Sequence, residues 1–233
     1  RDVTDDVAND VDGGDVRERC HRQLGDDAPC QRHRRLLANQ THGADGLEVE
    51  EHAAGVEGAR VDSVSGKRVS GPLQGFGQLW QKTFKVRLDG VAMTPQELVA
   101  EWKARFPTFW PGGARFYAPL AGIAPGEVAL LDIPPVPGSP IKLSTGVMVL
   151  YSDDESFTFM TPEGHTLSAW ITFSAFRDGD TTVAQAQALE RTSDPFDEMA
   201  YMLGANKLND RFWRQTLENL ARHVGTTTPD VET

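Results

Sequence analysis

The stretch that decides the fold is residues 194–225, DPFDEMAYMLGANKLNDRFWRQTLENLARHVG. Asp194 followed by Pro195 is typical of a helix start, and Gly225 is typical of the position just past a helix end. An unbroken helix between these signals would be about 45 Å long, enough to cross a whole sheet. Gly204 weakens its middle and is a candidate for a kink. Apolar side chains recur along one predicted face: Phe196, Met199, Leu203, Trp213, Leu217, Leu220 and Val224.

A run of predicted strands precedes this helix. Turn signals rich in Pro, Gly and Asp separate the strands, and such short connections are typical of an antiparallel meander. In the last strand Ala184, Ala186 and Ala188 share one face, which would let a covering helix approach closely. The strands are expected within ARFYAPL (114–120), GEVALLDIP (126–134), STGVMVLYSD (144–153), ESFTFMTP (155–162), HTLSAWITFSAF (165–176) and TTVAQAQALERT (181–192).

One more strand and a short helix come before the meander. Residues 77–90, GQLWQKTFKVRLDG, alternate in polarity and are predicted to form a strand that ends at Asp89-Gly90. Thr94 and Glu97 then have the spacing of a capping box, and Pro95 stands at the first helical position. A helix is therefore expected from Pro95 until Pro107 stops it.

The first 70 residues differ sharply in composition from the rest. They contain no Phe, Trp, Tyr, Ile or Met, so they lack the apolar area that would offset the entropy of ordering them. We interpret residues 1–70 as a disordered extension or as an artefact of the assigned start. Residues 76–225 are expected to form the folded domain, and residues 226–233 a flexible tail. No metal site is predicted, because the spacing of Cys20, His21, Cys30 and His33 matches no common zinc pattern.

Charge and motifs exclude several classes of function. The net charge is −11 and no basic stripe is present, which disfavours binding to nucleic acid or to anionic membrane surfaces. No apolar run approaches the roughly 18 residues that a membrane span needs, and no signal peptide is visible, so we expect a cytoplasmic protein. Nucleotide-binding glycine loops are absent from the sequence, and we predict no cofactor.

The order of these elements resembles the START-like superfamily, also called SRPBCC, which includes polyketide cyclases and dehydrases, lipid-transport domains and the birch-pollen-allergen type. The resemblance covers residues 76–225 and rests on element order, not on a diagnostic motif. It implies an α+β helix-grip fold, in which a curved antiparallel sheet wraps around a long C-terminal helix. It also implies a cavity between sheet and helix that holds a small apolar or aromatic molecule. The residues expected to line that cavity are Trp110, Arg115, Tyr117, Tyr151, Trp170, Phe176, Met199 and Met202.

Three residues are candidates for moving a proton: His165, Tyr117 and Asp132. His165 follows Pro162-Glu163-Gly164, and we interpret it as a turn residue between two strands, with a functional histidine at the mouth of a pocket as the alternative. Tyr117 is able to bond a ligand carbonyl, and Asp132 ends an apolar strand. No catalytic constellation is evident around any of the three.

The sequence thus leaves three functions open. The first is binding of a small hydrophobic or aromatic ligand without chemical change. The alternative is an enzyme of the cyclase or dehydratase type, which requires two titratable groups converging inside the cavity. The third is a protein-interaction domain with a filled core and an exposed apolar patch. The sequence does not determine the oligomeric state.

Overall fold

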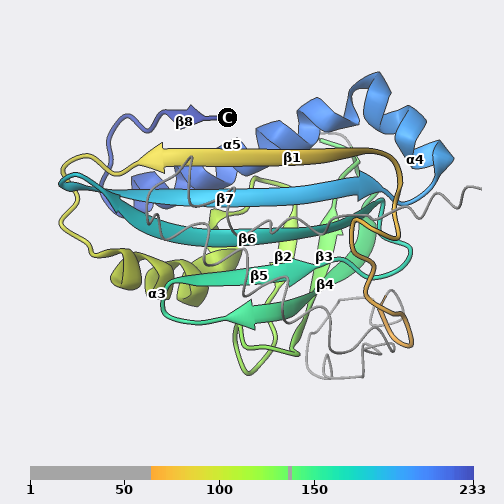
Figure 1. Ribbon diagram of the computed structural model, residues 1–233, viewed down its shortest axis with the longest axis horizontal. Coiled ribbons are helices and arrows are strands. Elements are labelled where there is room, and N and C mark those ends of the chain that lie inside the picture. Colours follow the sequence, from red (N-terminus) through yellow and green to blue (C-terminus); the bar gives the residue numbers. More distant parts are fainter. Residues whose placement is uncertain (1–63, 136–137) are drawn as a thin grey trace, which may run out of the picture. The chain divides into compact units, whose positions relative to one another are not determined.

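The computed structural model describes residues 64–135 and 138–233 (Figure 1). Every predicted strand is present, and its ends lie within a few residues of the expected limits. The strands are β1 (Phe76–Arg87), β2 (Arg115–Tyr117), β3 (Val128–Ile133), β4 (Leu143–Ser152), β5 (Ser156–Met160), β6 (Leu167–Asp178), β7 (Thr181–Thr192) and β8 (Val231–Glu232).

These strands form one antiparallel sheet in the order β2-β3-β4-β5-β6-β7-β1-β8 among the described residues. Strands β2 to β7 follow one another as a meander, because each turn is too short for a crossover. The early strand β1 pairs with the late strand β7, with Lys82 opposite Ala188 and Phe84 opposite Ala186. Figure 1 shows β1 and β7 side by side, in front of α5 (Asn206–His223).

Both long helices pack on the same side of the sheet, which we call the helix-facing side; the opposite side is the outer side. Helix α3 (Pro95–Arg105) begins with the predicted capping box between Thr94 and Glu97, and the 3-10 helix η2 (Phe106–Phe109) follows it. The helix-facing side carries the main core, in which Phe84, Phe157, Phe173, Trp102 and Leu217 are fully buried. Ala184 and Ala186 belong to this core, as the alanine row predicted.

The C-terminal helix is broken in its middle, at the glycine that the sequence marks as a candidate for a kink. It consists of α4 (Pro195–Ala200), the π-helical turn η3 (Tyr201–Ala205) and α5. The break lies at Gly204, whose φ of 132° is open to glycine but not to L side chains. Leu217 and Leu220 of the predicted apolar face are fully buried, whereas the part of that face before the break is exposed.

The two ends of the folded part differ from expectation. Residues 64–75 lie against the outer side of the sheet: Val64 is buried beside Leu130 and Met148, and Ser70 Oγ bonds Ser168 Oγ at 2.8 Å. At the other end Val231 is buried and pairs with Val86, so the expectation of a flexible tail does not hold for β8. Each of these segments is anchored by one buried valine, Val64 or Val231, which the overall composition of the segment does not reveal. The predictions for residues 1–63, including the cysteines and histidines, lie outside the described residues.

The architecture is the predicted helix-grip arrangement, an antiparallel sheet with α3 and α5 on one side. Within residues 64–135 and 138–233, no helix is both long and apolar enough to cross a lipid bilayer.

Candidate functional site

The strand register divides the predicted ligand-lining residues between the two sides of the sheet. Successive side chains of a strand point to opposite sides, and Phe116, Leu131 and Phe173 belong to the helix-facing core. Their strand neighbours therefore point to the outer side. Trp110, which follows η2, is the one predicted lining residue that lies in the helix-facing core.

Tyr117, Asp132 and Arg115 are neighbours on the outer side, away from the expected cavity. The Tyr117 hydroxyl donates to Asp132 Oδ2 at 3.1 Å, and the Ser144 hydroxyl donates to Asp132 Oδ1 at 2.7 Å. Arg115 is exposed and stands opposite Asp132 in the β2–β3 ladder. Arg115 and Tyr117 therefore do not line the space between sheet and helix, because Phe116 takes the inward position on β2.

The remaining lining candidates are also displaced from the helix-facing core. Trp170 lies beside Met160 and the backbone of Gly71 on the outer side. Phe176 lies under the ammonium group of Lys85, also on the outer side. Tyr151 stands opposite Thr158 in the β4–β5 ladder, after a bulge. Before the helix break, Met199 is 54% exposed and Met202 is 60% exposed.

His165 occupies the turn before β6, in agreement with its interpretation as a turn residue. Its backbone N–H donates to the Pro162 carbonyl, and its Nδ1 accepts a hydrogen bond of 3.0 Å from the Leu167 N–H. Burial of the imidazole lowers the pKa of His165 to about 4, and the positive charge of Lys67 acts in the same direction. The neutral ring therefore fixes the geometry of the turn.

An aromatic core fills the helix-facing side near α3 and the second half of α5. We use this name for Trp102, Phe106, Trp110, Phe116, Phe157, Phe159 and Phe173. The ring of Phe106 contacts five of the others, at centroid distances of 4.9 to 6.2 Å. The indole N–H groups of Trp102 and Trp110 are buried there and have no acceptor within the described part of the chain. Buried polar groups are hydrogen-bonded as a rule, so these two donors call for an explanation.

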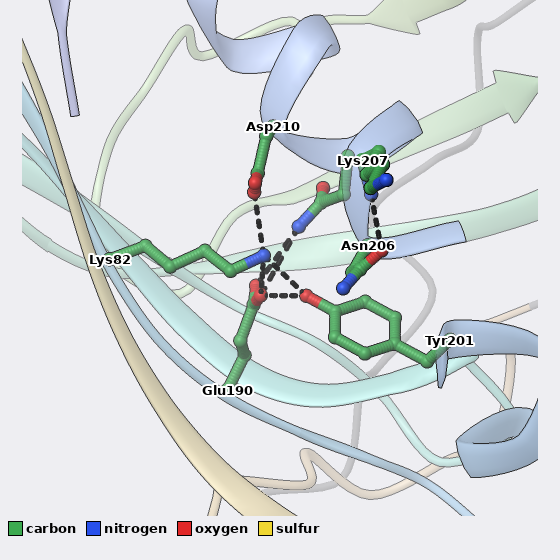
Figure 2. Close-up of polar contacts among 7 residues, drawn as sticks. Lys82, Glu190, Tyr201, Asn206, Lys207 and Asp210 are labelled. Carbon is green, nitrogen blue, oxygen red and sulfur yellow. Dashed lines mark hydrogen bonds and ion pairs between the residues drawn. The ribbon is translucent and has the colours of Figure 1, made fainter. Parts of the chain in front are cut away.

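A polar cluster lies on the same side of the sheet, beneath the helix break (Figure 2). It consists of Lys82, Glu190, Tyr201, Asn209 and Asp210. The Lys82 ammonium lies 2.6 Å from the Tyr201 hydroxyl, 2.6 Å from Asp210 Oδ1 and 3.0 Å from Glu190 Oε1. Tyr201 donates its hydroxyl proton to Glu190, and the Asn209 amide donates to both oxygens of Glu190 at 3.2 and 3.3 Å. The side chains of Lys82 and Glu190 are only 10% and 3% exposed.

Strand alternation and the helix break bring the side chains of the polar cluster together. Lys82 shares the inward side of β1 with Phe84 and Val86, and Glu190 shares the inward side of β7 with Ala186 and Ala188. Asn209 and Asp210 come from the first two turns of α5. Tyr201 reaches the cluster because the helix changes direction at the neighbouring Gly204.

The charges in the polar cluster stabilise one protonation state. Burial alone lowers the pKa of Lys82, but the negative charge of Glu190 and the hydrogen bonds to Asp210 and Tyr201 outweigh it, so the pKa lies above its ordinary value. For the Tyr201 phenol, whose charged form is an anion, burial raises the pKa above its ordinary value, and the negative charge of Glu190 adds to the increase. At neutral pH the cluster therefore holds an ammonium ion and a neutral phenol. Both are hydrogen-bond donors, and neither acts as a base.

Sequence reasoning missed the polar cluster, although a signal for part of it existed. A charged residue at an inward strand position, such as Lys82 between Trp80 and Phe84, needs a buried partner. Glu190 is likewise a charged residue at an inward strand position, directly after the alanine row of β7. No local pattern pointed to Tyr201, because its inward position depends on the conformation of Gly204.

Comparison with known proteins finds no matching family model, and no curated protein matches the sequence. Solved structures of similar fold include Ara h 8.0201, 8% identical with a TM-score of 0.47, over 63% of this chain and 98% of that one. A START superfamily protein from Mycobacterium smegmatis is 17% identical with a TM-score of 0.43, over 65% of this chain and all of that one. The aromatase/cyclase StfQ of the steffimycin biosynthetic pathway, a di-domain protein, is 11% identical with a TM-score of 0.47, over 62% of this chain and 50% of that one.

The strand order and the position of the helices identify the fold. The seven strands β1 to β7 lie between Phe76 and Thr192 in the sequence. The broken helix follows them, and its second part packs on the helix-facing side of the sheet. The described part of the chain therefore has the helix-grip fold.

Proposed function

We propose that this domain binds a small hydrophobic or aromatic molecule between the sheet and the C-terminal helix. The observation that carries the proposal is the pair of buried indole donors, Trp102 and Trp110, which have no acceptor among the described residues. A ligand oxygen or nitrogen at this position would satisfy one or both of them. Without an acceptor each donor costs about 1–3 kcal/mol of desolvation.

The surroundings of the two donors suit an apolar ligand. Trp102 packs edge-on against Phe157 and Phe173, and Trp110 packs edge-on against Phe106 and Phe212. Ligand sites are typically lined by such apolar and aromatic groups with a few polar atoms that set orientation. A ligand that enters here would have to displace some of these rings, with the indole N–H groups as its polar anchors.

Native mass spectrometry of the full chain, purified from its own host, tests this proposal. We expect a small molecule to co-purify with the wild-type protein. The Trp110→Phe variant keeps a ring but removes the N–H donor, and its affinity for the recovered molecule should fall by about threefold to tenfold, the effect of one hydrogen bond.

Trp170→Phe is the matched control, because Trp170 lies on the outer side of the sheet and its replacement should leave the affinity unchanged. Equal losses in both variants would point to a general loss of stability and not to an anchor. If neither the purified protein nor a panel of lipids and aromatic compounds gives a complex, the proposal fails. The domain would then be an interaction module with a filled core.

A cyclase or dehydratase activity is the second candidate, and the polar cluster favours it. Lys82, Glu190 and Tyr201 converge on the helix-facing side, where a bound substrate would lie. Two of these groups are protonated donors, able to polarise a carbonyl oxygen, and Glu190 is an acceptor. Each is already bonded within the cluster, so a substrate would have to replace one of these contacts.

The molecule recovered from a Glu190→Gln variant distinguishes the two candidates. A dehydratase lacking its acceptor should retain a species heavier by one water than the molecule recovered from the wild type. A domain that only binds should retain the same mass in both. Asp132→Asn serves as the control. It removes a carboxylate that also accepts side-chain hydrogen bonds, but that lies on the outer side of the sheet.

A further inference from the structure

The broken C-terminal helix presents opposite faces to the sheet on the two sides of its break. In α5 the apolar residues Leu217 and Leu220 are fully buried. In α4 and η3 only Tyr201 is buried, and the large apolar residues point outward. They form the apolar row, which is Phe196 (72% exposed), Met199, Met202 and Leu203 (82% exposed).

An unbroken helix would reverse this arrangement. Met199 precedes Leu217 by eighteen residues, which is about five turns at 3.6 residues per turn. Met199 would therefore lie on the buried face of α5, with the rest of the apolar row within about 60° of it. Tyr201 would point away from the sheet. The sequence thus encodes two faces for the same segment, and the break at Gly204 selects the one with less apolar burial.

Few contacts hold the segment 195–205 in its bent form. The Tyr201 hydroxyl bonds Glu190 and Lys82, and the ring lies 6.3 Å from that of Trp80. Glu198 accepts a hydrogen bond of 2.9 Å from the Thr192 hydroxyl. Helix α4 itself has no buried residue. The bent form therefore depends on polar contacts and on the positive φ of Gly204.

We propose that residues 195–205 switch between this bent form and a straight form in which α4 and η3 continue α5 and the apolar row turns inward. In the straight form Met199 and Met202 face the space between sheet and helix, so they become contacts for the bound molecule. This last step rests on the proposed function, whereas the switch itself does not. Helical turns of the π type are frequent at functional sites, and a ligand that prefers one of two conformations shifts the population toward it.

Methionine oxidation in the full chain tests the switch directly. Dilute hydrogen peroxide oxidises exposed methionines faster than buried ones, and peptide mass spectrometry reports each site. Met199 and Met202 should react rapidly in the wild type, while the buried Met148 reacts slowly and serves as an internal reference. Gly204→Ala disfavours the bent form and raises helix propensity, so it should slow oxidation of Met199 and Met202 in proportion to the loss of the exposed form, by about fivefold when the bent form falls to about a fifth of the molecules.

Gly225→Ala is the matched control. Gly225 also has a positive φ, 109°, and an added Cβ at either glycine meets nothing within 4 Å. Both variants therefore carry similar backbone strain, but only Gly204 lies at the break. If Met199 and Met202 oxidise at the same rate in Gly204→Ala as in Gly225→Ala, the switch is refuted.

A second variant keeps the test decisive if Gly204→Ala does not fold. Tyr201→Phe removes only the hydroxyl that bonds the polar cluster, and it should also slow oxidation of Met199 and Met202. Tyr117→Phe removes a hydroxyl bonded to Asp132 on the outer side and should leave the rates unchanged. Faster or unchanged oxidation in Tyr201→Phe would contradict an inward-facing apolar row.

The neutral apolar dye N-phenyl-1-naphthylamine separates the switch from its link to ligand binding. If the straight form holds the ligand, the dye should slow oxidation of Met199 and Met202 in the wild type, and Gly204→Ala should bind the dye more tightly. Protection by Gly204→Ala without any dye binding would retain the switch and count against the proposed function. Dye binding without protection of either methionine would overturn the ligand contact.

Discussion

The two halves of the C-terminal helix rest on the same sheet but are held there by different forces. The second half, α5, buries Leu217, Leu220 and Ala221 against the aromatic core. The first half, α4 with η3, buries only Tyr201, over the polar cluster. Apolar contact is non-directional and tolerates small shifts, whereas the polar cluster requires each donor to meet its acceptor.

This difference separates stability from specificity within one helix. Replacing buried ion pairs by apolar groups is often neutral or stabilising, so the polar cluster is weak evidence for a contribution to stability. It does fix one arrangement, because Tyr201 reaches Glu190 only when the helix is broken. The aromatic core includes several of the largest fully buried side chains, and the polar cluster determines which face of α4 and η3 lies on the sheet.

The largest effect should come from the aromatic core. Phe173→Ala removes a fully buried ring and leaves a cavity, so we expect the free energy of unfolding to fall by about 3–5 kcal/mol in urea titrations. Phe196→Ala is the matched change in the other half, and at 72% exposure it should cost less than about 0.5 kcal/mol. A large loss in Phe196→Ala would mean that the apolar row is buried in solution.

Removing the cation of the polar cluster should have the next largest effect. Lys82→Met leaves Glu190 buried without its ammonium partner, and we expect a loss of about 3 kcal/mol in the free energy of unfolding. Lys85→Met, on the outer side of the same strand, removes a lysine that lies over Phe176 and should cost less than about 1 kcal/mol. Similar losses for the two lysines would show that the buried cluster contributes no more to the free energy of unfolding than a lysine on the surface does.

The turn at His165 should add a pH dependence outside both halves. Because the pKa of His165 is about 4 in the folded chain against 6.5 for a free imidazole, the unfolded state binds more protons between these values. Stability from this group is fully present above pH 6.5 and is lost progressively as the pH falls toward 4.

Asn at position 165 retains an acceptor for the Leu167 N–H and does not titrate. We expect the stability difference between wild type and His165→Asn to change by about 1–2 kcal/mol between pH 7 and pH 4, with the wild type losing more. The measurement is urea unfolding of both proteins at each pH. A constant difference would mean that the imidazole titrates normally in the fold.

The smallest effects should come from the helix caps. Thr94→Ala removes the cap of α3, whose inward face is buried, and should cost about 1 kcal/mol of global stability. Asp194→Ala removes the cap of α4, which has no buried residue, and should only increase amide hydrogen exchange within residues 195–200. If Asp194→Ala lowers global stability as much as Thr94→Ala, then α4 is coupled to the core more strongly than its exposure indicates.

Much of the fold could be predicted from the sequence, because alternation and turn signals report strands directly. The choice of inward side could not be read in the same way. In β6 both sides carry large apolar residues, Trp170 and Phe176 on one side and Ile171 and Phe173 on the other, and alternation alone does not rank them. The predicted site residues on the strands therefore fell on the outer side, whereas Trp110 lies in the helix-facing core and Met199 and Met202 are exposed on α4 and η3.

The polar cluster could be predicted only in part, for a different reason. Lys82 and Glu190 each interrupt an inward row, and a charge at such a position implies a buried partner. Which partners meet them depends on the tertiary fold. Gly204 marks a candidate kink in the sequence, but the direction in which this kink turns Tyr201 toward Glu190 depends on the tertiary fold.

The pairing of β1 with β7 has a consequence for the order of events during synthesis. Lys82 pairs across the sheet with Ala188 and bonds Asp210, 128 residues later in the chain. Contacts of such long range are slow to form, because the intervening loop must close first. On the ribosome β1 must wait, with its inward lysine hydrated, until β7 and the start of α5 have emerged. The sheet is therefore expected to close as a late step, in which the last third of the chain completes the partner set of the first described strand.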